Sequence, residues 1–181
     1  MAIFSGKLAS KNEYFQLFLV CLLPIHVWAI INLMRRASSL VLSVNSLDIL
    51  GVLAYVLLFA LFESLIAFAV LFTLSLILPA QFFSSKLIPV GTVLVLLASV
   101  SAVFIHLYNA WEIEDIKFDL WAGMWAFIGL VATGPSVYLI RRDKRIGAAI
   151  QGVVDRLSVL SMIYLFFDFL GLAAVIIRNI F

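Results

Sequence analysis

The chain has few charged residues and a single cysteine. Of its 181 residues, 12% are charged and 65% are hydrophobic, and the mean hydropathy is +1.20. A soluble domain is typically about 25% charged and about 45–50% apolar, so this composition excludes one. Cys21 has no second cysteine to pair with, which excludes an intrachain disulfide. We interpret Cys21 as a core thiol, because free cysteine packs as a small hydrophobe.

Motifs for catalysis and metal binding are also missing. The sequence holds no H-E-x-x-H, no G-x-S-x-G, no glycine-rich phosphate loop and no Cys or His cluster at zinc spacing. Its net charge of +2, without interleaved basic and aromatic residues, offers little to a nucleic acid. We therefore expect no catalytic centre of its own, no cofactor, no metal site and no nucleic-acid partner.

Long apolar runs dominate what is present. There are five, and each exceeds the roughly 18 residues that indicate a transmembrane helix: Tyr14–Met34, Leu47–Leu78, Leu87–Ala110, Leu120–Ile140 and Val154–Ile177. The first run is too long for a signal-peptide core of about 7–15 residues, so we expect it to be retained. The sequence predicts an all-α integral membrane protein in which residues 1–181 form one bundle of about five transmembrane helices.

Lysine and arginine are unevenly distributed between the two sides of this bundle. Eight fall on the side of the N-terminus: Lys7, Lys11, Lys86, Arg141, Arg142, Lys144, Arg145 and Arg156. Four fall on the opposite side: Arg35, Arg36, Lys117 and Arg178. The positive-inside rule then predicts the N-terminus inside and the C-terminus outside. We expect the cytoplasmic membrane of a prokaryote.

Three ionisable residues interrupt the apolar runs: His26, Glu63 and Asp168. A charged group at the centre of a membrane helix costs about 2.5–3.5 kcal/mol on insertion scales. Glu63 has Ala60, Ser64 and Ala67 nearby on its helix, and small residues admit close helix packing. We therefore predict that Glu63 faces other helices, with Asp168 or His26 as its partner.

Asp168 lies on a comparable stripe of small and polar residues, formed by Ser158, Ser161, Tyr164 and Gly171. Two interpretations of the three ionisable residues stay open. They could form a proton or cation relay, since intramembrane ionisable groups often mark transport pathways. Alternatively, each is a hydrogen-bonded structural residue, which is the interpretation we prefer.

Polar breaks separate the apolar runs, namely "RRASS", "PAQFFSSK", "WEIEDIKFD" and "RRDKR". Asn45 and Asp48 are spaced as in a helix cap. We expect the last break to be a loop whose Arg141, Arg142, Lys144 and Arg145 bind anionic lipid headgroups, at about 1 kcal/mol per basic residue. We also expect Arg35 and Arg36 to pair with the acidic residues Glu112, Glu114, Asp115 and Asp119.

The leading hypothesis is a small membrane subunit or scaffold that binds a protein partner, a lipid or a second copy of itself. The alternative is a small proton- or cation-coupled transporter or channel that uses Glu63, Asp168 and His26. A third is a membrane-embedded lipid-modifying enzyme or its anchor. Five spans with an outward C-terminus resemble, in topology alone, the membrane anchor of lipid-headgroup transferases of the alkaline-phosphatase superfamily.

Overall fold

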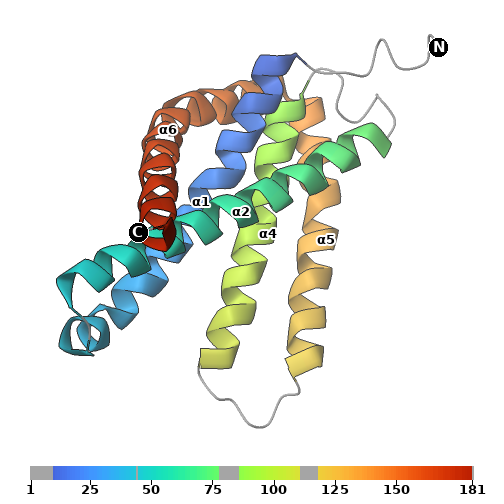
Figure 1. Cartoon of the computed structure of the whole chain (residues 1–181). Coiled ribbons are helices and arrows are strands. Elements are labelled where there is room, and N and C mark those ends of the chain that lie inside the picture. Colours follow the sequence, from blue (N-terminus) through green and yellow to red (C-terminus); the bar gives the residue numbers. More distant parts are fainter. Residues whose placement is uncertain (1–9, 44, 78–85, 111–117, 181) are drawn as a thin grey trace.

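The computed structural model describes residues 10–43, 45–77, 86–110 and 118–180. In these ranges the chain forms five helices and no strand (Figure 1): α1 Lys11–Ser43, α2 Ser46–Ile77, α4 Leu87–Ala110, α5 Phe118–Arg142 and α6 Lys144–Ile180. Each helix contains an apolar stretch long enough to cross a membrane. The predicted all-α class with five candidate spans is confirmed.

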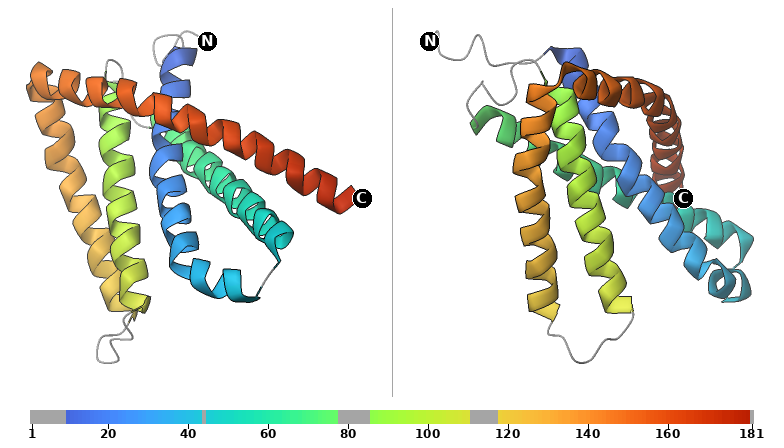
Figure 2. Two further views of the ribbon diagram at one scale, coloured as in Figure 1. Left: turned by 90° about the vertical axis from the view of Figure 1, so that its left-hand side faces the viewer. Right: turned by 180° about the vertical axis from the view of Figure 1, so that it is seen from behind.

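The helices do not form a parallel bundle. Helices α4 and α5 run side by side as an antiparallel hairpin, whereas α2 crosses the molecule obliquely (Figure 1). Helix α6 starts where α5 ends, passes across the ends of α4 and α1, and then lies against α2 (Figure 2). The start of α1, the start of α4, the end of α5 and the start of α6 therefore share one end of the molecule, which we call the basic end.

Helix α1 is longer than the sequence predicted. It continues from Met34 through Arg35 and Arg36 to Ser43, so the predicted break at "RRASS" is wrong. Arginine and alanine are good helix formers and no glycine or proline interrupts them. The helix therefore extends beyond the end of the apolar run. The end of α1 turns away from the direction of its first part (Figure 2). The chain reverses at Asn45, whose carbonyl accepts hydrogen bonds from the N–H groups of Asp48 and Ile49 at 3.0 Å.

Helix α6 also begins earlier than predicted, at Lys144 instead of Val154. The expected loop at "RRDKR" is wrong, because Asp143 is the single non-helical residue between α5 and α6. Its side-chain Oδ1 accepts a hydrogen bond from the N–H of Arg145 at 2.8 Å, as an N-cap does. Its own N–H donates to the carbonyl of Leu139 at 2.9 Å, which closes α5. One residue thus ends one helix and caps the next.

The apolar core lies toward the basic end, where α1, α4 and α5 meet. Leu17, Leu87, Val90 and Ile140 form a buried cluster there. Gly91 allows α4 to approach α1 closely, since a Cβ at this position would lie 2.4 Å from a methyl carbon of Leu17. This packing holds the starts of α1 and α4 against the end of α5, and so shapes the pocket described below.

Candidate functional sites

Two of the three predicted intramembrane polar residues meet in the interior. Nε2 of His26 on α1 lies 2.8 Å from Oδ1 of Asp168 on α6, and both side chains are 0% exposed. Nδ1 of His26 lies 2.9 Å from the carbonyl oxygen of Leu22, one turn earlier. A carbonyl only accepts, so Nδ1 carries a proton and donates it. The pair therefore shares one further proton between Nε2 and Oδ1.

The second oxygen of Asp168, Oδ2, is buried and has no hydrogen-bond partner in the described part of the chain. Within the described residues this carboxyl is therefore held through Oδ1 alone, and the pair is an interhelical hydrogen bond between α1 and α6.

The predicted stripe on α6 packs against the rest of the bundle. The hydroxyl of Ser161 donates to the carbonyl of Leu19 at 2.8 Å, and the ring of Tyr164 stacks on His26 at a centroid distance of 5.5 Å. A Cβ at Gly171 would lie 3.3 Å from the carbonyl oxygen of Ala54, so the glycine permits close contact with α2. Asp168 is therefore embedded in a close-packed interface.

Glu63 does not join this pair, and the prediction that its partner is Asp168 or His26 is wrong. Ala60 and Ser64 are buried as expected, but Glu63 is exposed. Successive residues on a helix are about 100° apart, so Glu63 points well away from Ser64 at the centre of the buried face. It makes no hydrogen bond or ion pair with any residue that the structure describes.

Glu63 opens instead onto a cavity of about 560 Å³ between α1, α2 and α4. We call this the Glu63 cavity. Its other polar groups come from one face of α1 and from α4. They are Asn32, Arg36 and His106, with Trp28 and Phe59 among the apolar walls. The rings of Trp28 and His106 meet edge to face at 5.3 Å, and Asn32 donates to the carbonyl of Trp28 at 3.0 Å.

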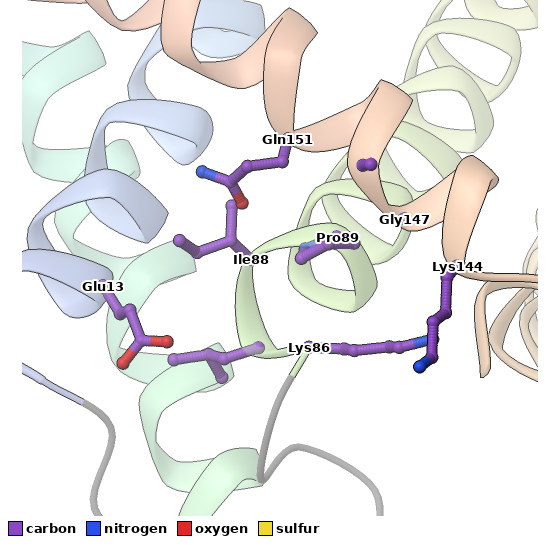
Figure 3. Close-up of a pocket in the computed structure, with 9 residues that line it drawn as sticks. Glu13, Lys86, Ile88, Pro89, Lys144, Gly147 and Gln151 are labelled. Carbon is purple, nitrogen blue, oxygen red and sulfur yellow. The ribbon is translucent and has the colours of Figure 1, made fainter.

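A second pocket, of about 230 Å³, lies at the basic end (Figure 3). We call it the Lys86–Lys144 pocket. It is lined by Glu13, Lys86, Leu87, Ile88, Pro89, Lys144, Gly147, Ala148 and Gln151. Of the four residues predicted to bind lipid headgroups, Lys144 lines it, whereas Arg141, Arg142 and Arg145 are exposed outside it. The sequence reasoning missed Lys86, Glu13 and Gln151 because they lie far apart in the chain.

A further prediction concerns the pairing of Arg35 and Arg36 with acidic residues. Arg35 and Arg36 are exposed on α1, but Glu112, Glu114, Asp115 and the side chain of Asp119 lie outside the described residues. Their pairing therefore stays a prediction.

Within residues 10–43, 45–77, 86–110 and 118–180, no three His, Cys, Asp or Glu side chains are grouped to hold a metal ion.

Comparison with known proteins yields no relative. No protein-family profile, no curated protein and no solved structure matches this chain.

Proposed function

We propose that this chain is a membrane subunit that binds a transmembrane segment of a partner protein along the exposed face of α2. The observation that supports this is the position of Glu63, an acid near the middle of an apolar helix, exposed and without a polar partner in the described chain. A lone ionisable group within a membrane-spanning segment is costly. A partner helix that offers a basic or hydrogen-bonding side chain removes that cost.

The surface beside Glu63 suits a helix. Tyr55, Phe59, Phe62, Ile66 and Val70 are exposed along α2 at spacings of three and four residues, which form one continuous apolar stripe. Glu63 lies at the edge of this stripe and is the acidic residue beside it. Helix association in membranes depends on packing and on interhelical hydrogen bonds, and α2 supplies both. The partner segment should therefore carry Lys, Arg, His, Asn or Ser at the depth of Glu63.

The buried His26–Asp168 pair serves a different purpose in this proposal. Each residue is fully buried and engages the other, so neither offers a group to a partner. The pair fastens α6 to α1 and so supports the surface that α2 presents. The chain then acts by binding, as a scaffold.

Crosslinking in native membranes tests the partner. A photoreactive residue at Phe62, which is 61% exposed, should give one defined protein adduct, and the same probe at Phe127 of α5, which is 65% exposed, should not. Glu63→Leu should abolish the Phe62 adduct, while Glu63→Gln, which keeps a hydrogen-bonding group, should retain much of it. The proposal fails if Phe62 labels only lipid or if Glu63→Leu leaves the adduct unchanged.

The orientation forms part of the same proposal. The basic end gathers Lys86, Arg141, Arg142, Lys144 and Arg145, and the positive-inside rule predicts that this end faces the cytoplasm. A reporter inserted at Asp143 should then be active inside the cell, and one fused after Phe181 should be active outside. Activity of both reporters on the same side would contradict the five-span arrangement.

Proton- or cation-coupled transport is the second candidate, favoured by the Glu63 cavity. Glu63, His106 and Asn32 together line a space of about 560 Å³, which is large enough for hydrated ions. The predicted site of Glu63, Asp168 and His26 then reduces to Glu63, because the other two residues pair with each other. Reconstituted vesicles separate the candidates, since Glu63→Gln would abolish flux by a transporter yet preserve the adduct of a subunit.

A further inference from the structure

The two lysines of the Lys86–Lys144 pocket differ in their surroundings. The ammonium of Lys86 donates to the carbonyl of Ile140 and to that of Arg141, the latter at 3.3 Å. An ammonium has three donors, so one N–H remains for a ligand. Lys144 is exposed at the start of α6. In Figure 3 the side chain of Lys86 extends toward that of Lys144, so this part of the pocket is positively charged.

Hydrogen-bond acceptors line the opposite part of the pocket. Oε2 of Glu13 on α1 accepts hydrogen bonds from the N–H and the hydroxyl of Ser10 at 2.7 and 3.0 Å. Oε1 of Glu13 therefore remains as an acceptor for a ligand. Gln151 donates through Nε2 to Oε1 of Gln16 at 3.3 Å and to Oδ1 of Asp155 at 3.0 Å, which leaves its amide oxygen. Glu13 lies across the pocket from Lys144 in Figure 3. The pocket thus has a cationic part and an accepting part.

We propose that the Lys86–Lys144 pocket binds the headgroup of a glycerophospholipid whose phosphate is followed by a hydrogen-bond donor. The phosphate binds Lys144 and the third N–H of Lys86, because charge-assisted hydrogen bonds to phosphate are the strongest that lysine makes. The donor, an ammonium or hydroxyl, faces Glu13 and Gln151. Ethanolamine and glycerol headgroups meet both requirements, whereas a choline headgroup has no donor.

The size and position of the pocket agree with this ligand. At about 230 Å³ it is smaller than the roughly 300–1,000 Å³ of sites for drug-sized molecules, and a headgroup is smaller than such a molecule. It opens where the apolar helices end, which is where the headgroup layer of a bilayer begins. Basic pockets between transmembrane helices on the cytoplasmic side are known lipid sites. The site is independent of the partner proposed at α2.

Native mass spectrometry of the full chain, titrated in detergent with defined lipids, tests the assignment. Phosphatidylethanolamine and phosphatidylcholine have the same net charge and differ in the donor, so we expect several-fold higher occupancy with ethanolamine. Phosphatidylglycerol should also bind. Glycerophosphoethanolamine, which lacks acyl chains, should bind much more weakly. Equal binding of this soluble headgroup would overturn the lipid assignment, and equal occupancy by choline lipid would overturn the role of Glu13 and Gln151.

Two charge-matched variants separate the pocket from the general basic surface. Lys144→Gln removes a lining cation, and Arg145→Gln removes an exposed cation beside it on the same helix that does not line the pocket. Lys144→Gln should lower occupancy on the order of tenfold, the loss of one charge-assisted hydrogen bond, with little change for Arg145→Gln. Equal losses in the two variants would show diffuse attraction and overturn the site.

A third variant examines the accepting part. Glu13→Gln keeps the pattern that caps α1 through Ser10 but removes the negative charge. It should reduce the preference for ethanolamine over choline lipid while the melting temperature of the apo protein stays the same. An unchanged preference in this folded variant would contradict contact between the headgroup donor and Glu13.

Discussion

The group formed by α1, α2 and α6 is held differently from the α4–α5 hairpin. In the group, polar contacts join distant parts of the chain at three levels. Gln16 meets Asp155 at 3.3 Å near the basic end, His26 meets Asp168 in the middle, and Arg178 meets Asp48 at 2.7 Å at the far end. These contacts fix the position of α6 along its neighbours.

The hairpin relies on packing between helices that are adjacent in sequence. Phe104 and Trp125 stack nearly parallel with centroids 4.1 Å apart. A Cβ at Gly129 would lie 2.9 Å from the hydroxyl oxygen of Ser101. Much of α5 is exposed on its remaining faces. The difference teaches that hydrogen bonds and ion pairs between side chains join the helices of the α1–α2–α6 group. The hairpin instead combines apolar packing with hydrogen bonds to backbone carbonyls, from Ser101 to Trp125 at 3.4 Å and from Lys86 to Ile140.

The largest expected effect comes from breaking the buried pair. Asp168→Leu leaves Nε2 of His26 buried without a partner, which should lower the free energy of unfolding by about 3 kcal/mol. His26→Leu should cost a similar amount. The measurement is reversible unfolding in mixed detergent micelles.

The double variant makes this comparison sharper. His26→Leu combined with Asp168→Leu leaves neither group unpaired, and replacing both partners with apolar residues is often close to neutral. It should therefore cost much less than the sum of the single variants. A double variant whose cost equals that sum would show that the two residues act independently and that the group is not fastened by this pair.

A smaller effect is expected from enlarging Gly171. Gly171→Leu forces a side chain against the backbone of Ala54, and such overpacking should cost about 1–2 kcal/mol once the better helix propensity of leucine is subtracted. The same unfolding measurement applies. Loss of stability here would show that α6 needs close backbone contact with α2 in addition to its polar contacts.

Two glycines serve as matched controls for that substitution. At Gly152 on α6 and Gly123 on α5, an added Cβ would have no neighbouring atom within 4 Å. Leucine at either should be neutral or stabilise by up to about 1 kcal/mol. Destabilisation at Gly123 as large as at Gly171 would remove the distinction between the group and the hairpin.

The sequence predicted the helices better than their ends. Hydropathy identified five runs correctly, because lipid demands about 20 apolar residues per span. It placed the end of α1 and the start of α6 wrongly, since charged residues also form helices once they leave the hydrocarbon. Asp143 alone separates α5 from α6, and nothing in composition distinguishes such a junction from a short loop.

The candidate sites were predictable as residues and not as contacts. An ionisable group in an apolar run is conspicuous in any sequence, so His26, Glu63 and Asp168 were identified. Their pairing depends on a separation of 142 residues between His26 and Asp168, which helical periodicity does not address. The position of Glu63 was misjudged because small neighbours indicate a packed face but not its width. The place of Lys86 in the pocket was not predictable, because it depends on how the start of α4 approaches the end of α5 in three dimensions.

The separation between His26 and Asp168 also imposes an order on synthesis. At about 5–20 residues per second, the ribosome completes Asp168 roughly 7–28 s after His26. During that interval the chain already contains the imidazole of His26 but not the acid that pairs with it. The contact between α1 and α6 can therefore form only once the last helix has been made.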